Sequence, residues 1–325
     1  MSSHVDMFVK LGQRLAHFGN DEHTQDVIAR AITENGWFTR HDIIRAVEAI
    51  RVDMLNPERL DAWVACYPTP TKSLDVAVIM AGNIPLVGFF DMLCVLISGH
   101  RLHIKPSSKD KVLMHYIIDE LLRIEPSTPI YNYDANRTYD MAIATGGDDA
   151  NNYFREHFAT TRTLLRGSRH SIAVLDGLES EAELAGVAED ICAYSGLGCR
   201  SCSMLFVPRG WQCRLHSIEA INNKLNNNIR TLRATLTMQQ RPYIDCGGFI
   251  ATYGNSFPTT LAAVTLCEYD TLDEPRAWIA QNREKIQCIV SHCDIEGCVP
   301  LGRAQHPALT DYADGIDTML FLREA

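Results

Sequence analysis

The sequence predicts an α/β protein built from two successive units, each with a largely parallel sheet. From residue 74 onward, apolar runs of strand length alternate with amphipathic segments of helix length. This alternation is typical of parallel strands joined by right-handed helical crossovers. It starts again after residue 178, and a chain of 325 residues is long enough for two domains.

The first unit is expected to begin with helices and to continue as a sheet. Residues 5–65 have apolar side chains at helical spacing, and Thr39 is a suitable N-cap for one of these helices. Pro68 to Pro70 are expected to form a linker. Strands are then expected at 74–82, 101–105, 141–146, 162–168 and 171–177, with helices at 86–98, at 109–123 and from Asp148.

The second unit is expected to begin with a long helix after residue 178. This helix leads into the stretch AYSGLGCRSC at residues 193–202. The end of the chain is rich in turn residues and closes on the strand-like run MLFL at 319–322. Between them, strands are expected at 203–208, 261–270 and 286–291, and helices at 212–229 and 274–283.

Composition and charge narrow the function classes. The formal net charge is −10 and there is no basic cluster, so a nucleic-acid partner is not expected. The eleven cysteines are odd in number, the chain is long, and its first residues lack an apolar signal core. We therefore expect reduced thiols and a cytoplasmic location.

Residues 76–99 are apolar enough to suggest a membrane span. They carry a single charge, Asp91. However, Gly82, Asn83 and Pro85 interrupt the run early, so a buried strand, a turn and a buried helix explain it better. No membrane span is expected.

Three segments in the first unit link a predicted strand to a predicted helix, where open parallel sheets bind ligands. The turn that contains Asn83 offers a side-chain amide donor for a developing oxyanion, although asparagine is also common in ordinary turns. Lysine and hydroxyl groups at 105–108 suit a phosphate or a ribose, although Ser107 or Ser108 could simply cap the next helix. The glycine turn at 145–147 permits close approach of a ligand, and no G-x-G-x-x-G motif is present.

Cys199 is the candidate nucleophile. Two glycines precede it and Arg200 follows it, and an adjacent cation favours a thiolate. The alternative is a small buried residue, as most cysteines are. A redox or zinc pair with Cys202 is less plausible, because the neighbouring Cys192 and Cys213 do not complete a standard four-ligand spacing. His100 and His103 would point to opposite faces of a strand, so no metal is expected.

Taken in order, these segments resemble the aldehyde dehydrogenase superfamily. They are most similar to its acyl-CoA reductase branch, the family of the fatty acyl-CoA reductase component of bacterial bioluminescence. The resemblance covers roughly residues 74–325. Its motifs are Asn83 with Pro85, Gly99, the run from Lys105 to Ser107, the Thr145–Gly147 turn, the run from Gly196 to Cys199, and the tail PLGRAQHP, which resembles a Pro-x-Gly-Gly segment.

The resemblance implies an aldehyde-dehydrogenase-like fold. A nucleotide-binding, Rossmann-like parallel sheet domain would pair with a second α/β catalytic domain that carries the nucleophilic cysteine. We expect N-terminal helices and the dinucleotide-binding domain at 1–172, and the catalytic domain at 173–299. Residues 300–325 would return to the nucleotide domain or form an oligomer interface.

The chain departs from the resembled family in three places. The glutamate that activates the hydrolytic water in aldehyde dehydrogenases corresponds to Leu165. Loss of that base favours reduction of a thioester over hydrolysis. The acid typical of NAD-preferring relatives corresponds to Ser108, followed by Lys109, which favours NADPH while leaving NADH possible. A Glu-x-Phe-Gly segment that orients the nicotinamide ribose has no clear counterpart before Leu261.

The implied activity is reduction of an acyl-CoA to the aldehyde through a thioacyl-enzyme on Cys199, with Asn83 stabilising the oxyanion. Two alternatives stay open: an acyl-transferring or thioesterase-like enzyme without redox chemistry, and a non-catalytic scaffold. A homo-oligomer is expected, with a multienzyme partner as a further possibility. The implied cofactor-binding residues are Ala81, Gly82, Lys105, Ser107, Ser108, Thr145, Gly146 and Gly147.

Overall fold

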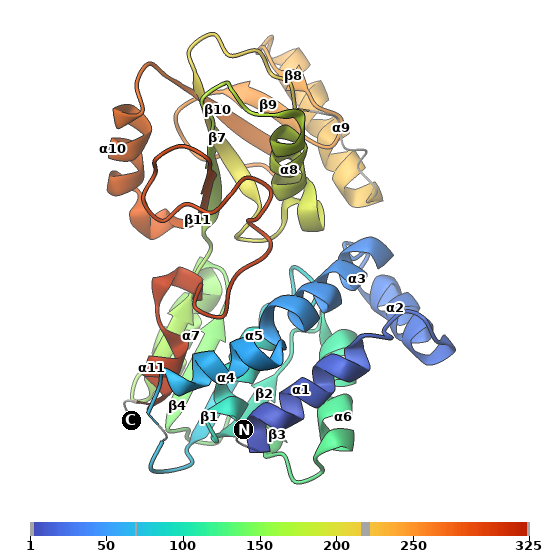
Figure 1. Cartoon of the computed structure of the whole chain (residues 1–325). Helices are drawn as coiled ribbons and strands as arrows, with labels where there is room; N and C mark the ends of the chain where they lie inside the picture. The colour runs from blue at the N-terminus through green and yellow to red at the C-terminus, as the bar shows by residue number, and fades with distance from the viewer. Residues whose placement is uncertain (1–2, 69, 216–221, 324–325) are drawn as a thin grey trace. The chain divides into compact units, whose positions relative to one another are not determined.

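The computed structural model describes residues 3–68, 70–215 and 222–323. The chain forms two compact units (Figure 1). Unit 1 comprises Met1–Ser168 and Ala308–Ala325, and unit 2 comprises Arg169–Pro307. The first division falls four residues before the expected boundary at 172, and the second falls eight residues after the expected boundary at 299.

Unit 1 contains a five-stranded sheet with the order β3-β2-β1-β4-β5. All of its pairings are parallel. The central strand β1 is buried almost throughout, as its apolar sequence predicts for a strand covered on both faces. The strands are β1 (Asp75–Ile79), β2 (Arg101–Lys105), β3 (Ile130–Asn132), β4 (Met141–Thr145) and β5 (Arg162–Arg166).

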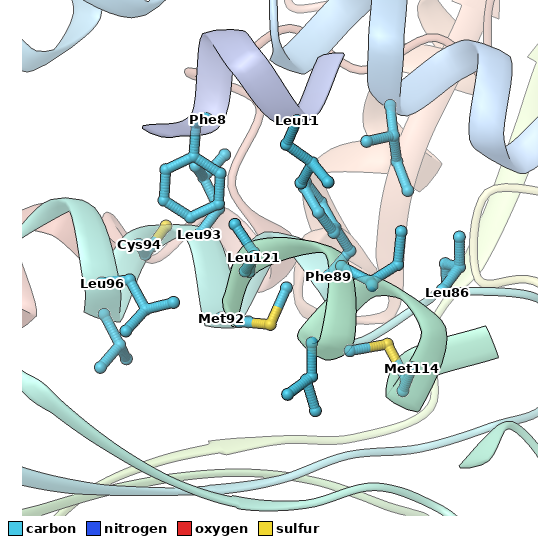
Figure 2. Close-up of a cluster of buried hydrophobic side chains, with 14 of the residues drawn as sticks. Phe8, Leu11, Leu86, Phe89, Met92, Leu93, Cys94, Leu96, Met114 and Leu121 are labelled. Carbon is cyan, nitrogen blue, oxygen red and sulfur yellow. The ribbon is translucent and has the colours of Figure 1, made fainter. Parts of the chain in front are cut away.

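Helices pack around this sheet, and all except α7 share one large core, whereas α7 contributes Phe154 to a separate cluster. Thr39 caps α3 by accepting the Asp42 N–H, as predicted. Phe8 of α1 meets Phe89 of α5 edge to face at 6.4 Å, and Figure 2 shows this contact within the cluster of buried side chains. The helices of unit 1 are α1 (Ser3–Leu15), α2 (Glu22–Glu34), α3 (Arg40–Ala49), α4 (Pro57–Ala65), α5 (Phe89–Ile97), α6 (Lys111–Ile124), α7 (Asp148–His157) and α11 (Thr318–Arg323).

Unit 2 contains a six-stranded sheet with the order β11-β6-β7-β10-β9-β8. Its pairings are parallel except for the short antiparallel pair of β8 and β9. The strands are β6 (His170–Val174), β7 (Cys202–Pro208), β8 (Ile244–Asp245), β9 (Ile250–Tyr253), β10 (Ala263–Tyr269) and β11 (Ile286–Ser291), and the helices are α8 (Glu181–Cys192), α9 (Asn223–Met238) and α10 (Asp273–Gln281).

Three expected elements are wrong in position or type. The strand expected at 171–177 in the first unit is β6 of the second sheet, where it pairs with β7 and β11. The helix expected at 212–229 is instead α9, because Asn222 accepts the N–H groups of Lys224 and Leu225 and so sets the helix start; residues 216–221 lie outside the described residues. The run MLFL forms helix α11 rather than a strand. Its start is fixed by Asp317, whose side chain accepts the Leu320 N–H.

The buried faces of these elements explain two other expectations. Met319 and Leu322 of α11 are fully buried at a spacing of three, which is a helical pattern, so this run supplies no terminal strand for association. The apolar residues 76–99 divide into β1, a turn and α5, as predicted. Within the described residues, no helix is both long and apolar enough to cross a bilayer.

Candidate functional site

The predicted cofactor-binding turns meet at one edge of the first sheet. Strand β1 lies between β2 and β4, and Ile79 is level with both Lys105 and Ala144. The turns that follow these three parallel strands therefore leave the same edge. The strand order also reverses between β1 and β4, the position at which open α/β sheets bind ligands. The residues gathered there are Ala81, Gly82, Asn83, Lys105, Ser107, Ser108, Thr145, Gly146 and Gly147.

The turns after β1 and β2 are in direct contact. A Cβ atom placed on Gly82 would come within 2.6 Å of the Ser107 side chain and 3.2 Å of the Asp110 Cβ. Only glycine permits this approach without displacing the second turn. Gly82, predicted as a cofactor-binding residue, is therefore needed first for the packing of the two turns.

The turn that contains Asn83 is pinned by a buried carboxyl group. Leu86 adopts a left-handed φ of 57° although its side chain is buried in the core, where Figure 2 shows it beside Phe89. Its N–H donates to Asp110 Oδ2 at 2.8 Å. Burial raises the pKa of Asp110 to about 8. Asp110 Oδ1 has no hydrogen-bond partner within the described part of the chain.

The N-cap of α6 is Asp110 and not one of the two serines before it. Ser107 or Ser108 was the alternative expected as the cap of α6, but Asp110 occupies the N-cap position, and its carboxyl accepts the Leu86 N–H instead of an N–H of its own helix. Ser107 Oγ accepts the Lys109 N–H at 3.3 Å, and Ser108 is exposed. The amide groups at the start of α6 therefore have no side-chain cap.

Lys105 is available to a ligand at the end of β2. It is exposed, and its Nζ lies 5.8 Å from the centre of the Tyr133 ring. That distance is within cation–π range, so Tyr133 holds the ammonium near the carboxyl edge of the sheet.

The turn after β4 leaves a helix start open. Gly147 occupies the N-cap of α7 without a side-chain cap, and among the described residues no heavy atom lies within 4 Å of a Cβ placed on it. Asn151 is buried and fixes the turn by donating to the carbonyl groups of Gly146 and Arg166, at 3.3 and 3.1 Å. The result is an open set of backbone N–H groups of the kind that binds phosphate oxygens.

Leu165, which stands where aldehyde dehydrogenases were expected to have a glutamate base, has apolar surroundings in the structure. Leu165 is partly buried and packs with a hydrophobic cluster that includes Phe154 and Phe158. Its neighbour Arg166 is buried and forms an ion pair with Asp91 of α5 at 2.9 Å. Arg166 also donates to Thr318 Oγ1 at 2.7 Å. The single charge in the apolar stretch 76–99 is thus paired inside the protein.

Cys199 follows α8 through a strained turn in unit 2. Tyr194, Ser195 and Gly196 have successive left-handed φ values of 53°, 57° and 72°. Each non-glycine residue held there costs about 1–3 kcal/mol. Such strain is common where a reactive side chain is presented on a sharp turn. Cys199 is half-buried and therefore keeps some contact with solvent.

Contacts on both sides fix the Cys199 backbone. Ser171 Oγ donates to the Cys199 carbonyl at 2.8 Å, and the Ser201 N–H donates to the Gly198 carbonyl at 2.9 Å. Arg200 Nη1 donates to the Ala304 carbonyl at 3.3 Å. The guanidinium expected to favour a thiolate is therefore also tied to the tail segment of unit 2.

The tail segment PLGRAQHP lies against the helix that leads to Cys199. A Cβ placed on Gly186 of α8 would come within 2.9 Å of the Gly302 Cα. Buried Asp190 accepts the N–H groups of Gly302 and Ala304 at 2.8 and 3.0 Å, and burial raises its pKa to about 7. Ser171, Asp190 and Asp110 were all missed by the sequence reasoning.

The burial of Cys202 disfavours a redox pairing with Cys199. Cys202 is buried at the start of β7, and burial raises the pKa of its thiol. No disulfide joins the eleven cysteines, all of which are among the described residues. Elsewhere, the Cys213 and Cys246 sulfurs lie 3.9 Å apart, and the hydrogen bond between them lowers the pKa of Cys213.

Asn83 belongs to unit 1 and Cys199 to unit 2. Their expected cooperation at one reacting carbonyl therefore stays a prediction.

A sequence model of the family Acyl-CoA reductase (LuxC) matches residues 71–241, more than half of the chain. The chain belongs to the LuxC family. The match includes Asn83, Lys105, the Thr145–Gly147 turn and Cys199. The predicted resemblance to the acyl-CoA reductase branch of the aldehyde dehydrogenases is thus confirmed.

Curated relatives of this LuxC family chain are reductases of acylated protein by name. One is the long-chain acyl-protein thioester reductase 2 of Photobacterium leiognathi, 25% identical over 175 residues, which are 47% of this chain. Another is the long-chain acyl-protein thioester reductase of Vibrio harveyi, 26% identical over 167 residues, which are 45% of this chain. The chain covers 37% and 35% of the length of these two relatives.

Solved structures show that the LuxC family chain has the aldehyde dehydrogenase fold. Aldehyde dehydrogenase 21 from Physcomitrella patens is similar with a TM-score of 0.66 at 11% identity, covering 99% of this chain and 83% of that one. The propionaldehyde dehydrogenase of Rhodopseudomonas palustris, solved with bound propionyl-CoA, gives a TM-score of 0.59 at 11% identity, covering 89% and 76%. The predicted fold class is confirmed.

Proposed function

We propose that the chain reduces a long-chain acyl thioester to the aldehyde, using a nicotinamide cofactor and a thioacyl intermediate on Cys199. The observation that carries the proposal is the strained, half-buried Cys199 turn in a chain of the LuxC family. Fixed nucleophiles of this kind divide acyl transfer into two easier steps.

The first step belongs to Cys199. Its thiolate sulfur bonds to the thioester carbonyl carbon, the bond from that carbon to the leaving sulfur breaks, and the leaving thiolate takes a proton. The Asn83 side-chain amide and the Cys199 N–H are proposed to bind the oxyanion. Removing one such donor typically costs about 10²–10³-fold in kcat.

The residues at the edge of the first sheet fit a nicotinamide dinucleotide. The open position at Gly147 and the N–H groups without a side-chain cap at the starts of α6 and α7 leave space and donors for phosphate oxygens. Lys105 supplies an exposed positive charge at the same edge. When bound, the cofactor supplies the hydride, and with it the two electrons, that reduces the acyl carbon. The Cys199 sulfur then leaves, and the aldehyde is released.

We propose a preference for NADPH over NADH. Ser108 and Lys109 are exposed, so a 2′-phosphate would meet a hydroxyl and an ammonium. The nearest carboxyl along this turn, Asp110, is buried and bonded to Leu86, so it is not free to bind a ribose.

The proposed substrate is a long-chain acyl group on a thiol, with CoA as the first carrier to test. Two features support a thioester. The first is the names of similar proteins: the family name refers to acyl-CoA, one structural neighbour was solved with an acyl-CoA, and the curated relatives are named for acyl-protein thioesters. The second is Leu165, an apolar side chain at the position of the base that would activate water, which disfavours hydrolysis.

The test is a kinetic assay of the purified chain with long-chain acyl-CoA or an acylated carrier protein, each with NADPH or NADH. We expect acyl-dependent oxidation of NADPH with release of one aldehyde per nucleotide. Cys202→Ser should keep this activity and Cys199→Ser should lose it. Thiol release without nucleotide oxidation would instead identify an acyltransferase or thioesterase. Failure to bind nucleotide at all would identify a scaffold.

A further inference from the structure

Three metal-binding side chains converge at the carboxyl ends of β6 and β11. These parallel strands are neighbours, with Val174 level with Ser291. Asp176 follows the first strand, and His292 and Cys293 follow the second. One carboxylate oxygen, one ring nitrogen and the sulfur of these three residues all lie within 4.8 Å of one another.

The His292 ring is held as metal-bound histidines usually are. Its Nε2 lies 2.9 Å from Asp176 Oδ1, and its Nδ1 lies 2.8 Å from Glu183 Oε1. A carboxylate on one ring nitrogen fixes the tautomer, so that the other nitrogen can bind a metal. Glu183 is itself immobilised, because its Oε2 accepts the N–H and Oγ–H of Ser180 in the capping box of α8.

A buried carboxyl group next to the cluster has one oxygen without a hydrogen-bond partner among the described residues. Glu179 is 3% exposed. Its Oε1 accepts the N–H groups of Asp176 and Gly177 at 2.7 and 3.1 Å, whereas its Oε2 has no hydrogen-bond partner within the described ranges. A buried carboxylate oxygen without a partner would be stabilised by a nearby cation.

We propose that Asp176, His292 and Cys293 bind a divalent transition metal of the zinc class, with Glu183 orienting His292. A thiolate, an imidazole and a carboxylate form a donor set suited to zinc, and a water molecule would complete four ligands. Zinc bonds of about 2.0–2.2 Å keep nitrogen and oxygen ligands roughly 3.3 Å apart in a tetrahedron. The Nε2 and Oδ1 atoms need to separate by only a few tenths of an ångström.

The site is accessible and separate from Cys199. The side chains of His292 and Asp176 are 29% and 32% exposed, which gives a metal ion a path from solvent. Ser171, which binds the Cys199 carbonyl, lies near the start of β6, whereas Asp176 lies beyond its end, about 16 Å away at strand spacing. The metal would join the loops after β6 and β11, and this role is independent of the proposed reduction.

The test uses the full chain after chelator treatment and dialysis, titrated with Co²⁺ and then Zn²⁺. We expect one equivalent of Co²⁺ to give a thiolate charge-transfer band and the visible bands of a tetrahedral site, both removed by Zn²⁺. Cys293→Ser should abolish the charge-transfer band, and Glu183→Gln should weaken binding about 10–100-fold. Cys213→Ser is the matched control, and it should leave the spectrum unchanged.

A second measurement needs no substitution. Stoichiometric Zn²⁺ should protect Cys293 from alkylation, as followed by peptide mass spectrometry, while Cys66 on the surface keeps reacting. The proposal is overturned if Co²⁺ gives no thiolate band, if the band survives Cys293→Ser, or if Zn²⁺ leaves the alkylation of Cys293 unchanged. In that case His292 acts only as a cation between Asp176 and Glu183.

Discussion

Replacing Asp110 with asparagine should stabilise unit 1 at neutral pH. The carboxyl is buried, and its one hydrogen bond in the described structure is with the Leu86 N–H, which either an ionised or a neutral oxygen can accept. Burial raises the pKa of Asp110 from the ordinary 3.8 to about 8. Asp110→Asn keeps the shape and the acceptor while removing the ionisable group.

The size and sign follow from the linkage between protons and folding. Between pH 4 and 8 the native state holds a proton that the unfolded chain has lost, so stability falls by about 1.4 kcal/mol per pH unit. The stability that the native state gains from holding this proton on Asp110 is fully present below pH 3.8, and it is lost as the pH rises through about 8. By pH 7 the loss reaches at most about 4 kcal/mol. An unpaired amide N–H costs about 1–2 kcal/mol, which leaves an expected net gain of about 2 kcal/mol.

The assay is urea unfolding at a series of pH values in a Trp211→Phe/Trp278→Phe background. Fluorescence then reports Trp37 and Trp63, which belong to unit 1. The advantage of Asp110→Asn should be absent near pH 4 and grow up to pH 8. Asp119→Asn, an exposed carboxyl on the same helix, is the control and should show no such trend. An advantage that does not depend on pH, or a variant less stable throughout, would refute the reasoning.

Three further changes test other parts of the account. Arg166→Met should destabilise unit 1 by about 3–5 kcal/mol in the same urea assay, because it leaves Asp91 buried and unpaired. The double variant with Asp91→Leu should recover most of this stability, and no recovery would contradict the explanation. Gly82→Ala should weaken NADPH binding measured by nucleotide fluorescence, because its Cβ would displace Ser107; unchanged affinity would remove the contact from the cofactor argument. Asn83→Ala should lower kcat about 10²-fold, and an unchanged rate would exclude it from the oxyanion site.

Local sequence pattern predicted four of the five strands of the unit 1 sheet and missed β3. The turns after β1, β2 and β4 carry asparagine, lysine and glycine between an apolar strand and a helix, and parallel topology then places them at one edge. Pattern failed where a single polar residue decided the outcome. Asn222 sets the start of α9, and Asp317 sets the start of α11.

Long-range partners could not be read from the sequence. Asp110 resembles an ordinary helix cap until the fold brings Leu86 to it, 24 residues away. Asp176 and His292 are separated by 116 residues and meet only because β6 and β11 are neighbours. An acidic residue inside an apolar helical pattern, as at Asp91 and Asp190, was the available signal for a buried partner.

The most direct test of the proposed function is the covalent state of Cys199. The chain is incubated with a long-chain acyl-CoA without nucleotide, and digested peptides are examined by mass spectrometry. The account predicts one acyl group on the peptide that contains Cys199, none in Cys199→Ala, and release of the aldehyde when NADPH is added. An acyl adduct on another residue, or one that persists in Cys199→Ala, would contradict it.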